Sequence, residues 1–145
     1  MTTHQATINH LNDLAPLFDG YRQFYKQSSD IEGAKGFLNE RLQKNDSIIF
    51  IAYIDEKPVG FMQLYHLFSS VSMRPMYLLN DLYVHADNRG KGIGEALINE
   101  AKKTAIANQQ KGIAIQTAYD NPAQDLYQRL GFEKDTDLHF FWTNT

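Results

Sequence analysis

Apolar residues recur at helical spacing near the start of the chain. Between Leu11 and Phe24 they occupy positions 11, 14, 17, 18, 21 and 24, and this spacing of three and four residues predicts a helix over 11–24. A second helix is predicted over 31–43, because Asp30 stands before it and is a good N-cap residue. A short strand over residues 5–8 is expected to precede both helices.

The middle of the chain has the composition of strands. Residues 47–53 and 59–68 are rich in β-branched and aromatic side chains, and the turn-forming sequence Asp55-Glu56-Lys57-Pro58 separates them. This pattern predicts a hairpin. Residues 76–84 are mostly apolar and predict a further strand inside the sheet.

The rest of the chain alternates helices with strands. A long helix is predicted over 92–108, with Ile93, Leu97, Ala101 and Ala105 on one side. A short strand over 112–117, a short helix over 123–130 and a final pair of strands over 133–142 are expected to follow. These elements predict an α/β fold of the α+β type, with a mixed sheet and helices on both faces. No repeat or linker divides the chain, so we expect one domain over residues 1–145.

Composition narrows the class of protein. The 145 residues carry a net charge of -3, so they lack the basic field that attracts nucleic acid. There is no cysteine, and the five histidines do not fall at metal-ligand spacing, so we expect no disulfide, no cysteine nucleophile and no metal. No apolar run reaches the roughly 18 residues that a membrane span needs, and the first residues do not form a signal peptide. We therefore expect a cytoplasmic protein that does not contact membranes.

A glycine-rich segment follows the predicted strand 76–84 and opens the long helix. This arrangement is suited to phosphate, because glycines allow a tight turn and the helix N-terminus presents free N–H groups. The dinucleotide pattern G-x-G-x-x-G fails here, since its last position is Glu95 when counted from Gly90 and Leu97 when counted from Gly92. The nucleoside triphosphate pattern also fails, since His85 occupies the place of its first glycine.

The remaining pattern, Arg89-x-x-Gly92-x-Gly94, resembles the pyrophosphate loop of the GNAT superfamily of N-acetyltransferases. The pattern alone is short, and a glycine-rich turn before an ordinary helix would also explain it. Its setting strengthens the resemblance, because the loop begins five residues after the last valine of a strand.

A second GNAT-like motif stands some thirty residues further along. It comprises a strand, Asn121, a short helix with Tyr127, and the pair Gly131-Phe132. Helix capping explains Asn121, Pro122 and Gly131 without any catalytic role, but it does not require Tyr127. The resemblance covers about residues 47–141 and is weak in the first 45.

The resemblance implies a GNAT fold, in which the strands 76–84 and 112–117 splay apart, and acetyl-CoA as cosubstrate. It implies Tyr127 as general acid and Asp81 as base or ammonium anchor, although Asp81 alternatively caps a neighbouring amide. The residues implied in cofactor binding are Leu82, Tyr83, Val84, Arg89, Gly90, Lys91, Gly92, Ile93, Gly94, Asn121 and Tyr127. The residues implied in substrate binding are Tyr25, Asp30, Asn80 and Asp81.

The segment Asn80-Asp81-Leu82-Tyr83-Val84 resembles Glu-Asp-Ile-Tyr-Val of diamine acetyltransferases, with Asn in place of Glu. It also resembles the yeast histone and D-amino-acid acetyltransferase branch. The loss of one acidic group puts polyamine specificity in doubt. Aromatic residues of the first half either line an acceptor pocket or belong to the core, and helical spacing favours the core for Tyr21 and Phe24. These aromatic residues are Tyr21, Phe24, Tyr25, Tyr65 and Phe68.

We therefore expect an enzyme that transfers acetyl to a primary amine of a small molecule, of the polyamine or amino-acid type, by direct attack in a ternary complex. The alternatives are a protein or peptide N-acetyltransferase and a non-catalytic acyl-CoA sensor. The family and the aromatic segment His139-Phe140-Phe141-Trp142 also suggest a homodimer.

Overall fold

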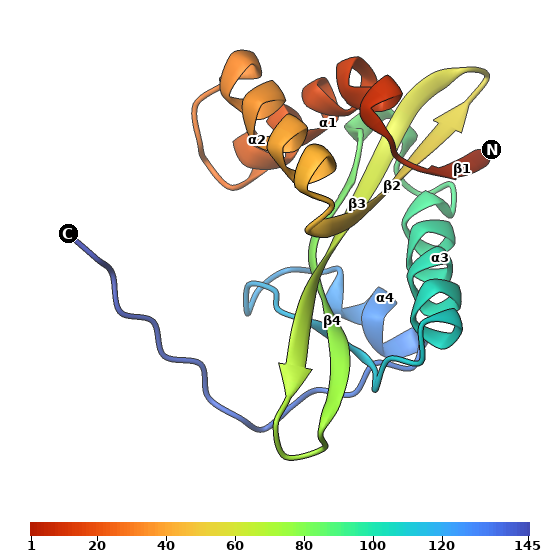
Figure 1. Ribbon diagram of the computed structural model, residues 1–145. Coiled ribbons are helices and arrows are strands. Elements are labelled where there is room, and N and C mark those ends of the chain that lie inside the picture. The colour runs from red at the N-terminus through yellow and green to blue at the C-terminus, as the bar shows by residue number, and fades with distance from the viewer.

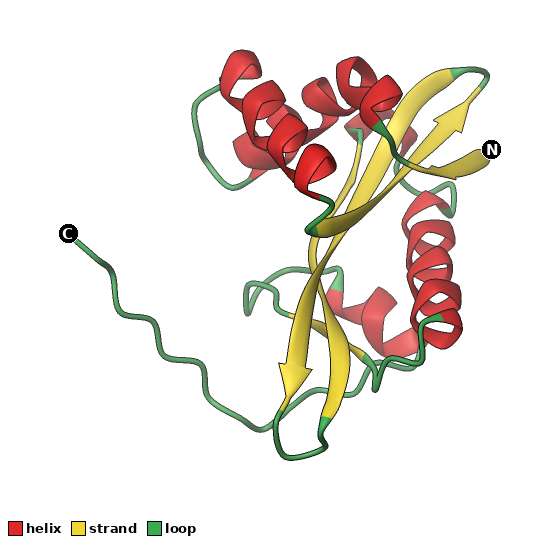
Figure 2. Cartoon of the chain, in the orientation of Figure 1, coloured by secondary structure: helices red, strands yellow, loops and turns green.

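The computed structural model describes residues 1–145, which form a five-stranded sheet and four α-helices (Figures 1 and 2). The strands are β1 Thr2–Gln5, β2 Ser47–Ile54, β3 Lys57–Ser69, β4 Arg74–Val84 and β5 Ile113–Ile115. The helices are α1 Leu11–Phe24, α2 Ile31–Lys44, α3 Ile93–Ala107 and α4 Gln124–Arg129, with short 3-10 turns at Ile8–His10 and Ala86–Asn88. None of these helices is long and apolar enough to cross a membrane.

The sheet is mixed, as predicted. Its strands follow chain order, β1-β2-β3-β4-β5; every neighbouring pair is antiparallel except β4 and β5, which are parallel. Helices α1 and α2 cover one face, and α3 and α4 cover the other (Figure 1). The fold class expected from the sequence is therefore confirmed.

Successive side chains of β2 pack alternately into two separate hydrophobic cores, one on each face of the sheet. Phe50 and Ala52 pack with α3, while Ile49 and Ile51 pack with α1 and α2. This follows from the two-residue period of a strand, which points successive side chains to opposite faces. We call these the α3 face and the α1 face of the sheet.

The predicted hairpin is confirmed and turns over two residues. Asp55 and Glu56 both have positive φ, at 49° and 65°, which is the backbone of the primed turns that match the twist of paired strands. Strands β2 and β3 pair from Ser47 to Ile54 across this turn.

Helix α1 follows its predicted pattern except at its end. Leu14, Leu17 and Phe18 are buried and Tyr21 is half-buried, but Phe24 is 54% exposed. The core assignment of Phe24 is therefore wrong. Helical spacing puts this residue on the right side of the helix, but α1 ends there and carries the side chain past its neighbours.

The connection between α1 and α2 is held by one buried carboxylate. Asp19 accepts hydrogen bonds from the backbone N–H of Asp30 at 2.7 Å and from the hydroxyl of Ser29 at 2.7 Å. These bonds lower the pKa of Asp19, the backbone bond most strongly. Asp30 is the N-cap of α2, as predicted, and accepts a bond from Gly33 N–H.

The last part of the chain differs from the prediction. Strand β5 has three residues instead of six, and the expected strand pair over 133–142 is absent. The segment instead runs away from the sheet as an extended tail (Figure 1). Its composition is that of a strand, but a strand forms only beside another strand, and no part of the chain lies next to it.

Candidate active site

A bulge in β4 determines which side chains face the site. Gln63 pairs with Asp81 and Leu64 pairs with Leu79, so Asn80 is an extra residue without a partner on β3. A bulge of this kind shifts the alternation of side chains by one residue. Tyr77 and Leu79 consequently belong to the core of the α3 face, whereas Asp81, which pairs with Gln63, points to the α1 face.

The pairing of β4 with β5 ends at the same place. The parallel register runs from Tyr77 with Ile113 to Leu79 with Ile115 and goes no further. From Asn80 to Val84, the edge of β4 on that side has no neighbouring strand. This is the splayed geometry expected for strands 76–84 and 112–117, and it leaves Leu82 and Val84 without a strand partner on that edge.

The glycine loop after β4 presents a row of free amides. None of the N–H groups from Gly90 to Glu95 donates a hydrogen bond within the chain. Gly90 and Gly92 have φ of 79° and 80°, a conformation that other residues rarely adopt. With Gly92 as the N-cap of α3, the loop can bind an anion through its amides and the positive end of the helix dipole.

The start of α3 is fixed against the sheet. Ile93 and Leu97 are buried in the core of the α3 face. Gly60 on β3 allows this close approach, because a Cβ there would lie 2.9 Å from the carbonyl oxygen of Tyr83 and 3.2 Å from Ile93. The loop therefore has a rigid support on one side.

Arg89 and Lys91 flank these glycines and are exposed. The Nε of Arg89 donates to the carbonyl oxygen of Val84 at 3.0 Å, and its guanidinium lies 5.8 Å from the rings of Phe24 and Tyr83. In this position Arg89 links the loop to the end of β4 and to the end of α1.

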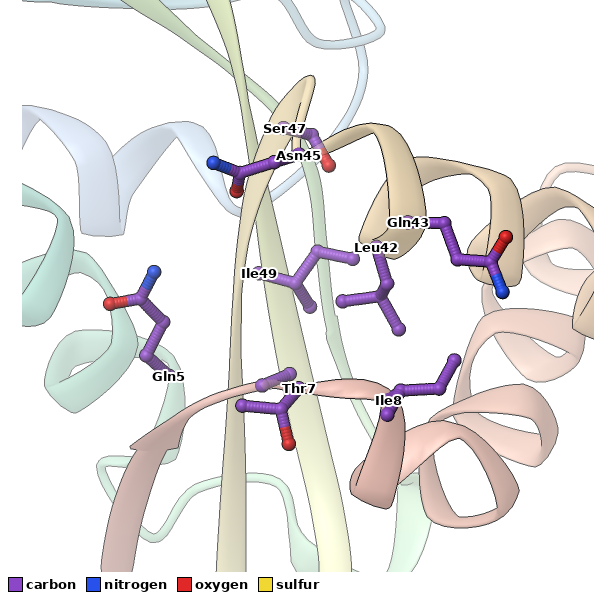
Figure 3. A pocket seen from close by; sticks show the side chains of 9 residues that line it. Gln5, Thr7, Ile8, Leu42, Gln43, Asn45, Ser47 and Ile49 are labelled. Carbon is purple, nitrogen blue, oxygen red and sulfur yellow. The ribbon is translucent and has the colours of Figure 1, made fainter.

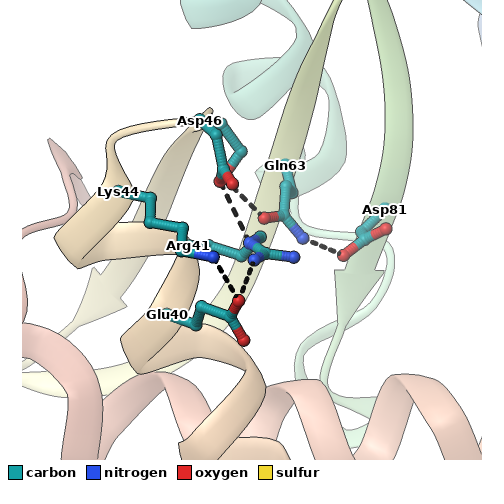
Figure 4. Close-up of polar contacts among 7 residues, drawn as sticks. Glu40, Arg41, Lys44, Asp46, Gln63 and Asp81 are labelled. Carbon is teal, nitrogen blue, oxygen red and sulfur yellow. Dashed lines mark hydrogen bonds and ion pairs between the residues drawn. The ribbon is translucent and has the colours of Figure 1, made fainter.

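Asp81 is 1% exposed and held by two amides. Gln63 Nε2 donates to Oδ2 at 2.6 Å, and Asn80 Nδ2 donates to Oδ1 at 2.6 Å. Ser47 in turn donates to Gln63 Oε1 at 2.8 Å, so one chain of hydrogen bonds crosses three strands (Figure 4). Burial raises the pKa of Asp81, and the hydrogen bonds from Asn80 and Gln63 partly oppose this effect.

The charge of the Asp81 carboxylate acts on two tyrosines, Tyr21 and Tyr65. Burial and then the negative charge of Asp81 raise the pKa of Tyr21, with smaller effects from Tyr25, Tyr65 and Tyr127. The same two causes raise the pKa of Tyr65 to about 12. Burial, followed by Tyr25, raises the pKa of Tyr127. All four phenols thus lie in one neighbourhood, and three of them have a raised pKa and hold their protons at neutral pH.

Tyr127 reaches this neighbourhood from the opposite face of the sheet. It lies on α4 and packs against the core of the α3 face, with its ring 6.3 Å from that of Phe132. Tyr21 and Tyr25 come from the end of α1, on the other face. Tyr21 donates its hydroxyl to the carbonyl oxygen of Asn80 at 3.0 Å, at the point where the pairing of β4 with β5 has just ended.

The cation beside Gln63 is already paired. Arg41 on α2 lies 3.0 Å from Asp46 and 3.2 Å from Glu40, and Glu40 also pairs with Lys44 at 2.7 Å (Figure 4). Asp81 itself has no ion pair. The charge of the Asp81 carboxylate is therefore not neutralised by a cation of the chain.

The second motif forms the connection from β5 to α4. Asn121 accepts from Ala123 N–H at 2.9 Å and donates to Thr117 at 2.8 Å, so its side chain closes the turn before the helix. At the other end, Gly131 has φ of 95°, and Phe132 N–H bonds to the carbonyl of Tyr127. This is a Schellman motif, and it confirms the predicted glycine cap.

The sequence prediction omitted two residues of this site, Ser47 and Gln63, and assigned Tyr21 to the core. A signal for Gln63 was present, since it is the one polar residue in the buried run Phe61–Leu64. Of the predicted substrate residues, Asn80 adjoins Asp81 and Tyr25 contacts the ring of Tyr21. The carboxylate of Asp30 is instead engaged as the cap of α2.

A separate groove of about 540 Å³ lies between the end of α2 and the chain after β1 (Figure 3). Its lining contains amides, hydroxyls and aliphatic groups but no ionisable side chain. It shares only Ser47 with the network described above, and it carries no group suited to acid–base chemistry.

Comparison with known proteins gives consistent results. A family model described as an acetyltransferase (GNAT) domain matches residues 45–134. The chain is 43% identical over 145 residues to YhfO of Bacillus subtilis, an uncharacterized N-acetyltransferase, and the alignment covers 99% of this chain and 97% of the relative. A solved structure of a probable acetyltransferase has a TM-score of 0.91 and 36% identity, covering 100% of this chain and 98% of the other. An aminoglycoside N-acetyltransferase in complex with CoA shares the fold, with a TM-score of 0.84, 21% identity, and coverage of 99% and 95%.

Proposed function

Because this chain belongs to the GNAT family and is an N-acetyltransferase, we propose that its substrates are acetyl-CoA and a primary amine of a small molecule. The observation that supports this most is the meeting of three features at one opening of the sheet. These are the free edge of β4, the unpaired carboxylate of Asp81 and the hydroxyl of Tyr127. The single domain and the cytoplasmic location stay predictions.

The residues present fit coenzyme A in two places. The unbonded N–H groups from Gly90 to Glu95 suit a pyrophosphate. The unpaired edge of β4 suits the amide-containing pantetheine arm, which can bond to the backbone of Leu82 and Val84 in the way that a neighbouring strand would. We also propose that Asn121 stabilises this side of the cleft by fixing the turn between β5 and α4.

When bound, acetyl-CoA supplies an acetyl group that is activated as a thioester. The amine must first lose a proton, and the raised pKa of Asp81 makes this carboxylate a better base than an ordinary aspartate. Asp81 passes that proton to solvent. As the C–N bond forms and the C–S bond breaks, Tyr127 protonates the departing sulfur, and the second proton of the nitrogen replaces the proton lost by Tyr127.

The surroundings of Asp81 favour an acceptor with one ammonium group. Asn80 stands next to Asp81 and donates its amide to it, so the site has one carboxylate where a second acidic group would suit a polyamine. The rings of Tyr21 and Tyr25 lie near it, 5.1 Å apart, and aromatic faces attract cations. We therefore place amino-acid-type monoamines before polyamines.

The test is release of free CoA from acetyl-CoA, measured with a thiol reagent against monoamines, polyamines, amino acids of both hands, aminoglycosides and short peptides. The chain contains no cysteine, so the protein adds no thiol background. We expect release with one class of small monoamine. Release only with peptides would overturn the acceptor class, and tight binding of acetyl-CoA without release with any amine would overturn the proposed reaction.

Asp81→Asn tests the carboxylate in the same assay. We expect at least a tenfold loss of kcat/KM for the amine, an order-of-magnitude figure for loss of a general base, while the affinity for acetyl-CoA stays unchanged. The matched control is Asp120→Asn, an exposed residue of the loop before α4, which should leave both quantities unaltered. An equal effect of the two substitutions would remove Asp81 from the mechanism.

A further inference from the structure

Gln63 is a fully buried amide in the middle of the sheet. It lies on β3, between β2 and β4, and is 0% exposed. It pairs directly with Asp81 on β4, and Ser47 on β2 is its diagonal neighbour, since Ser47 pairs with Tyr65. An amide in such a place costs free energy unless both of its ends are hydrogen-bonded. Both ends of Gln63 are bonded, because Oε1 accepts from Ser47 at 2.8 Å and Nε2 donates to Asp81 at 2.6 Å (Figure 4).

Ser47 determines which end of the amide faces the carboxylate. The oxygen and nitrogen ends of an amide have nearly the same shape, so packing alone does not choose between them. The hydroxyl of Ser47 has one proton and gives it to Oε1 of Gln63, which leaves the N–H groups facing Asp81. In the reverse orientation two acceptor oxygens would face each other. Ser47 is only 7% exposed, so water does not readily replace this bond.

The second oxygen of the carboxylate has a donor of a different kind. Asn80 Nδ2 donates to Oδ1 of Asp81 at 2.6 Å, but Asn80 is exposed and can exchange this bond for one to water. Gln63 is enclosed and cannot. Each carboxylate oxygen has two lone pairs and accepts only one bond from these amides. The carboxylate is thus fixed in orientation and keeps the capacity to accept a further bond.

We propose that Gln63 is the positioning residue of Asp81, and that Ser47 holds the Gln63 amide with its N–H groups toward the carboxylate. This inference rests on the proposed function, in which Asp81 takes a proton from the amine. A donor that bonds to the ionised form of a buried carboxylate opposes the effect of burial. Gln63 acts in that direction on the pKa of Asp81, so the carboxylate stays ionised and correctly oriented until the amine arrives.

The other titratable and charged groups near Asp81 do not replace this donor. Tyr21 on α1 also lowers the pKa of Asp81 through hydrogen bonding, but less than Gln63. Tyr65 on β3 responds to the charge of Asp81. Arg41 on α2 acts on Tyr65 and is paired with Asp46 at 3.0 Å. No other side chain donates to Oδ2 of Asp81, so the loss of Gln63 would leave that oxygen without a partner in the chain.

Gln63→Met tests the donor directly, because Met has a similar length and no N–H group. We expect the pKa of Asp81, followed by NMR of its ¹³C-labelled carboxyl carbon, to rise by about one pH unit, roughly the effect of losing a hydrogen bond to a charged group. The acid limb of kcat/KM for the amine should move upward by the same amount, while the affinity for acetyl-CoA stays unchanged. An unchanged pKa of Asp81 would overturn the proposal.

Ser47 provides a second pair of variants, which also serves if Gln63→Met does not fold. Ser47→Ala removes the donor that orients Gln63 and should raise the pKa of Asp81 by less than Gln63→Met does. Ser47→Thr keeps a hydroxyl and should restore the original value, since Ser47 lines the groove of about 540 Å³ and an added methyl group has space there. Equal pKa values of Asp81 in Ser47→Ala and in the unaltered chain would overturn the role given to Ser47.

The chain contains a matched control in Gln23. Its Nε2 donates to Oδ2 of Asp19 at 2.9 Å, and Asp19 is another buried carboxylate, 3% exposed. Gln23→Met therefore removes the same kind of bond from a carboxylate outside the proposed chemistry. We expect it to raise the pKa of Asp19 and to leave the pKa of Asp81 and the acid limb of kcat/KM where they are. A limb that moves equally in both Met variants would contradict a specific role of Gln63.

The two readouts separate a failure of this inference from a failure of the proposed function. A rise in the pKa of Asp81 without a shift of the acid limb would remove Asp81 as the base and leave Gln63 as its positioning residue. A shift of the limb without a rise would overturn the role of Gln63. A double-mutant cycle completes the test, because Gln63→Met should not lower kcat/KM further in an Asp81→Asn background. An equal loss in both backgrounds would show that Gln63 does not act through Asp81.

Discussion

The chain up to Gln110 and the chain after it differ in how completely they bury their apolar residues. All 27 buried residues precede Lys111, and none of the residues from Lys111 to the C-terminus is buried. The later portion nevertheless contains β5, α4 and a strand-like tail, with apolar residues in regular patterns. A pattern of apolar residues therefore predicts which side chains of a segment can be buried. Whether they are buried depends on the presence of a neighbouring element.

The difference coincides with a division of tasks. The earlier portion supplies the proposed cofactor loop and Asp81, which have buried neighbours such as Ile93 and Gln63 respectively. The later portion supplies Tyr127 on a six-residue helix whose apolar residues pack against the core of the α3 face but are only partly buried. The proposed chemistry thus joins a well-buried portion of the chain to a portion without buried residues.

The largest expected effect is on stability, and it compares a leucine of the earlier portion with a leucine of the later portion. Leu97→Ala removes a fully buried side chain and should cost about 2–5 kcal/mol of unfolding free energy. Leu130→Ala removes a half-buried one and should cost roughly 1 kcal/mol. Urea unfolding at low protein concentration measures both. Equal losses would show that the later portion is as well packed as the earlier one.

The next effect concerns activity. Tyr127→Phe keeps the ring and its contact with Phe132 but removes the hydroxyl, so turnover should fall by tenfold or more, an approximate figure for general acid catalysis. Steady-state kinetics with the identified acceptor measures it. Tyr119→Phe is the matched control, since Tyr119 is 95% exposed in the same portion of the chain. Unchanged turnover in Tyr127→Phe would show that the later portion supplies no acid.

A pair of glycines tests the rigidity of the earlier portion. Gly92→Ala forces a side chain into a residue with φ of 80° and should cost about 1–2 kcal/mol. Its binding of CoA, followed by calorimetry, should weaken as well. Gly36→Ala lies within α2 in open space and should gain about 0.5–1 kcal/mol from better helix propensity. A loss in both variants would contradict the strain assigned to the loop.

The smallest effect concerns two buried carboxylates of the earlier portion with opposite pKa shifts. The lowered pKa of Asp19 means that its stabilisation is present above the ordinary value of 3.8 and is lost as pH falls through the lower folded value. The raised pKa of Asp81 means that its ionisation destabilises the fold as pH rises above 3.8. Thermal unfolding at several pH values compares each variant with the unaltered chain.

Between acid and neutral pH, Asp81→Asn should therefore gain in melting temperature relative to the unaltered chain as pH rises above 3.8. Asp19→Asn should instead lose relative to it as pH rises toward 3.8. If the melting temperatures of the two variants changed with pH in the same direction, burial would not be the dominant influence on the pKa of Asp81.

The sequence predicted most of the earlier portion because local rules decide it. The spacing of Ile93, Leu97 and Ala101, the two-residue hairpin turn and the Asp30 cap each depend on residues close in the chain. The bulge at Asn80 and the hydrogen bonds of Gln63 with Ser47 and Asp81 were not predicted. They depend on the register between strands, which the periodicity of a single strand does not reveal.

The strand pair over 133–142 was wrong for a different reason. Leu138, Phe140 and Trp142 have the alternation of a strand, but pairing requires a partner that this portion of the chain does not supply. The error at Phe24 is similar on a smaller scale, since helical spacing cannot tell where the neighbouring surface ends. The assigned roles of Tyr127, Asp81 and the loop residues stay predictions until the substitutions are measured.

The extra residue in β4, Asn80, divides the strand into two segments whose odd-numbered side chains point to opposite faces of the sheet. Before the bulge, the odd-numbered residues Tyr77 and Leu79 pack in the core of the α3 face, whereas after it Asp81 and Tyr83 lie on the α1 face. In a regular ladder that kept Asn80 without the bulge, Asn80 would lie on the α1 face and Asp81 would turn toward the core of the α3 face. The bulge therefore lets Asp81 lie on the face of the proposed acceptor, while Leu82 and Val84 continue to pack against the same core as Tyr77 and Leu79.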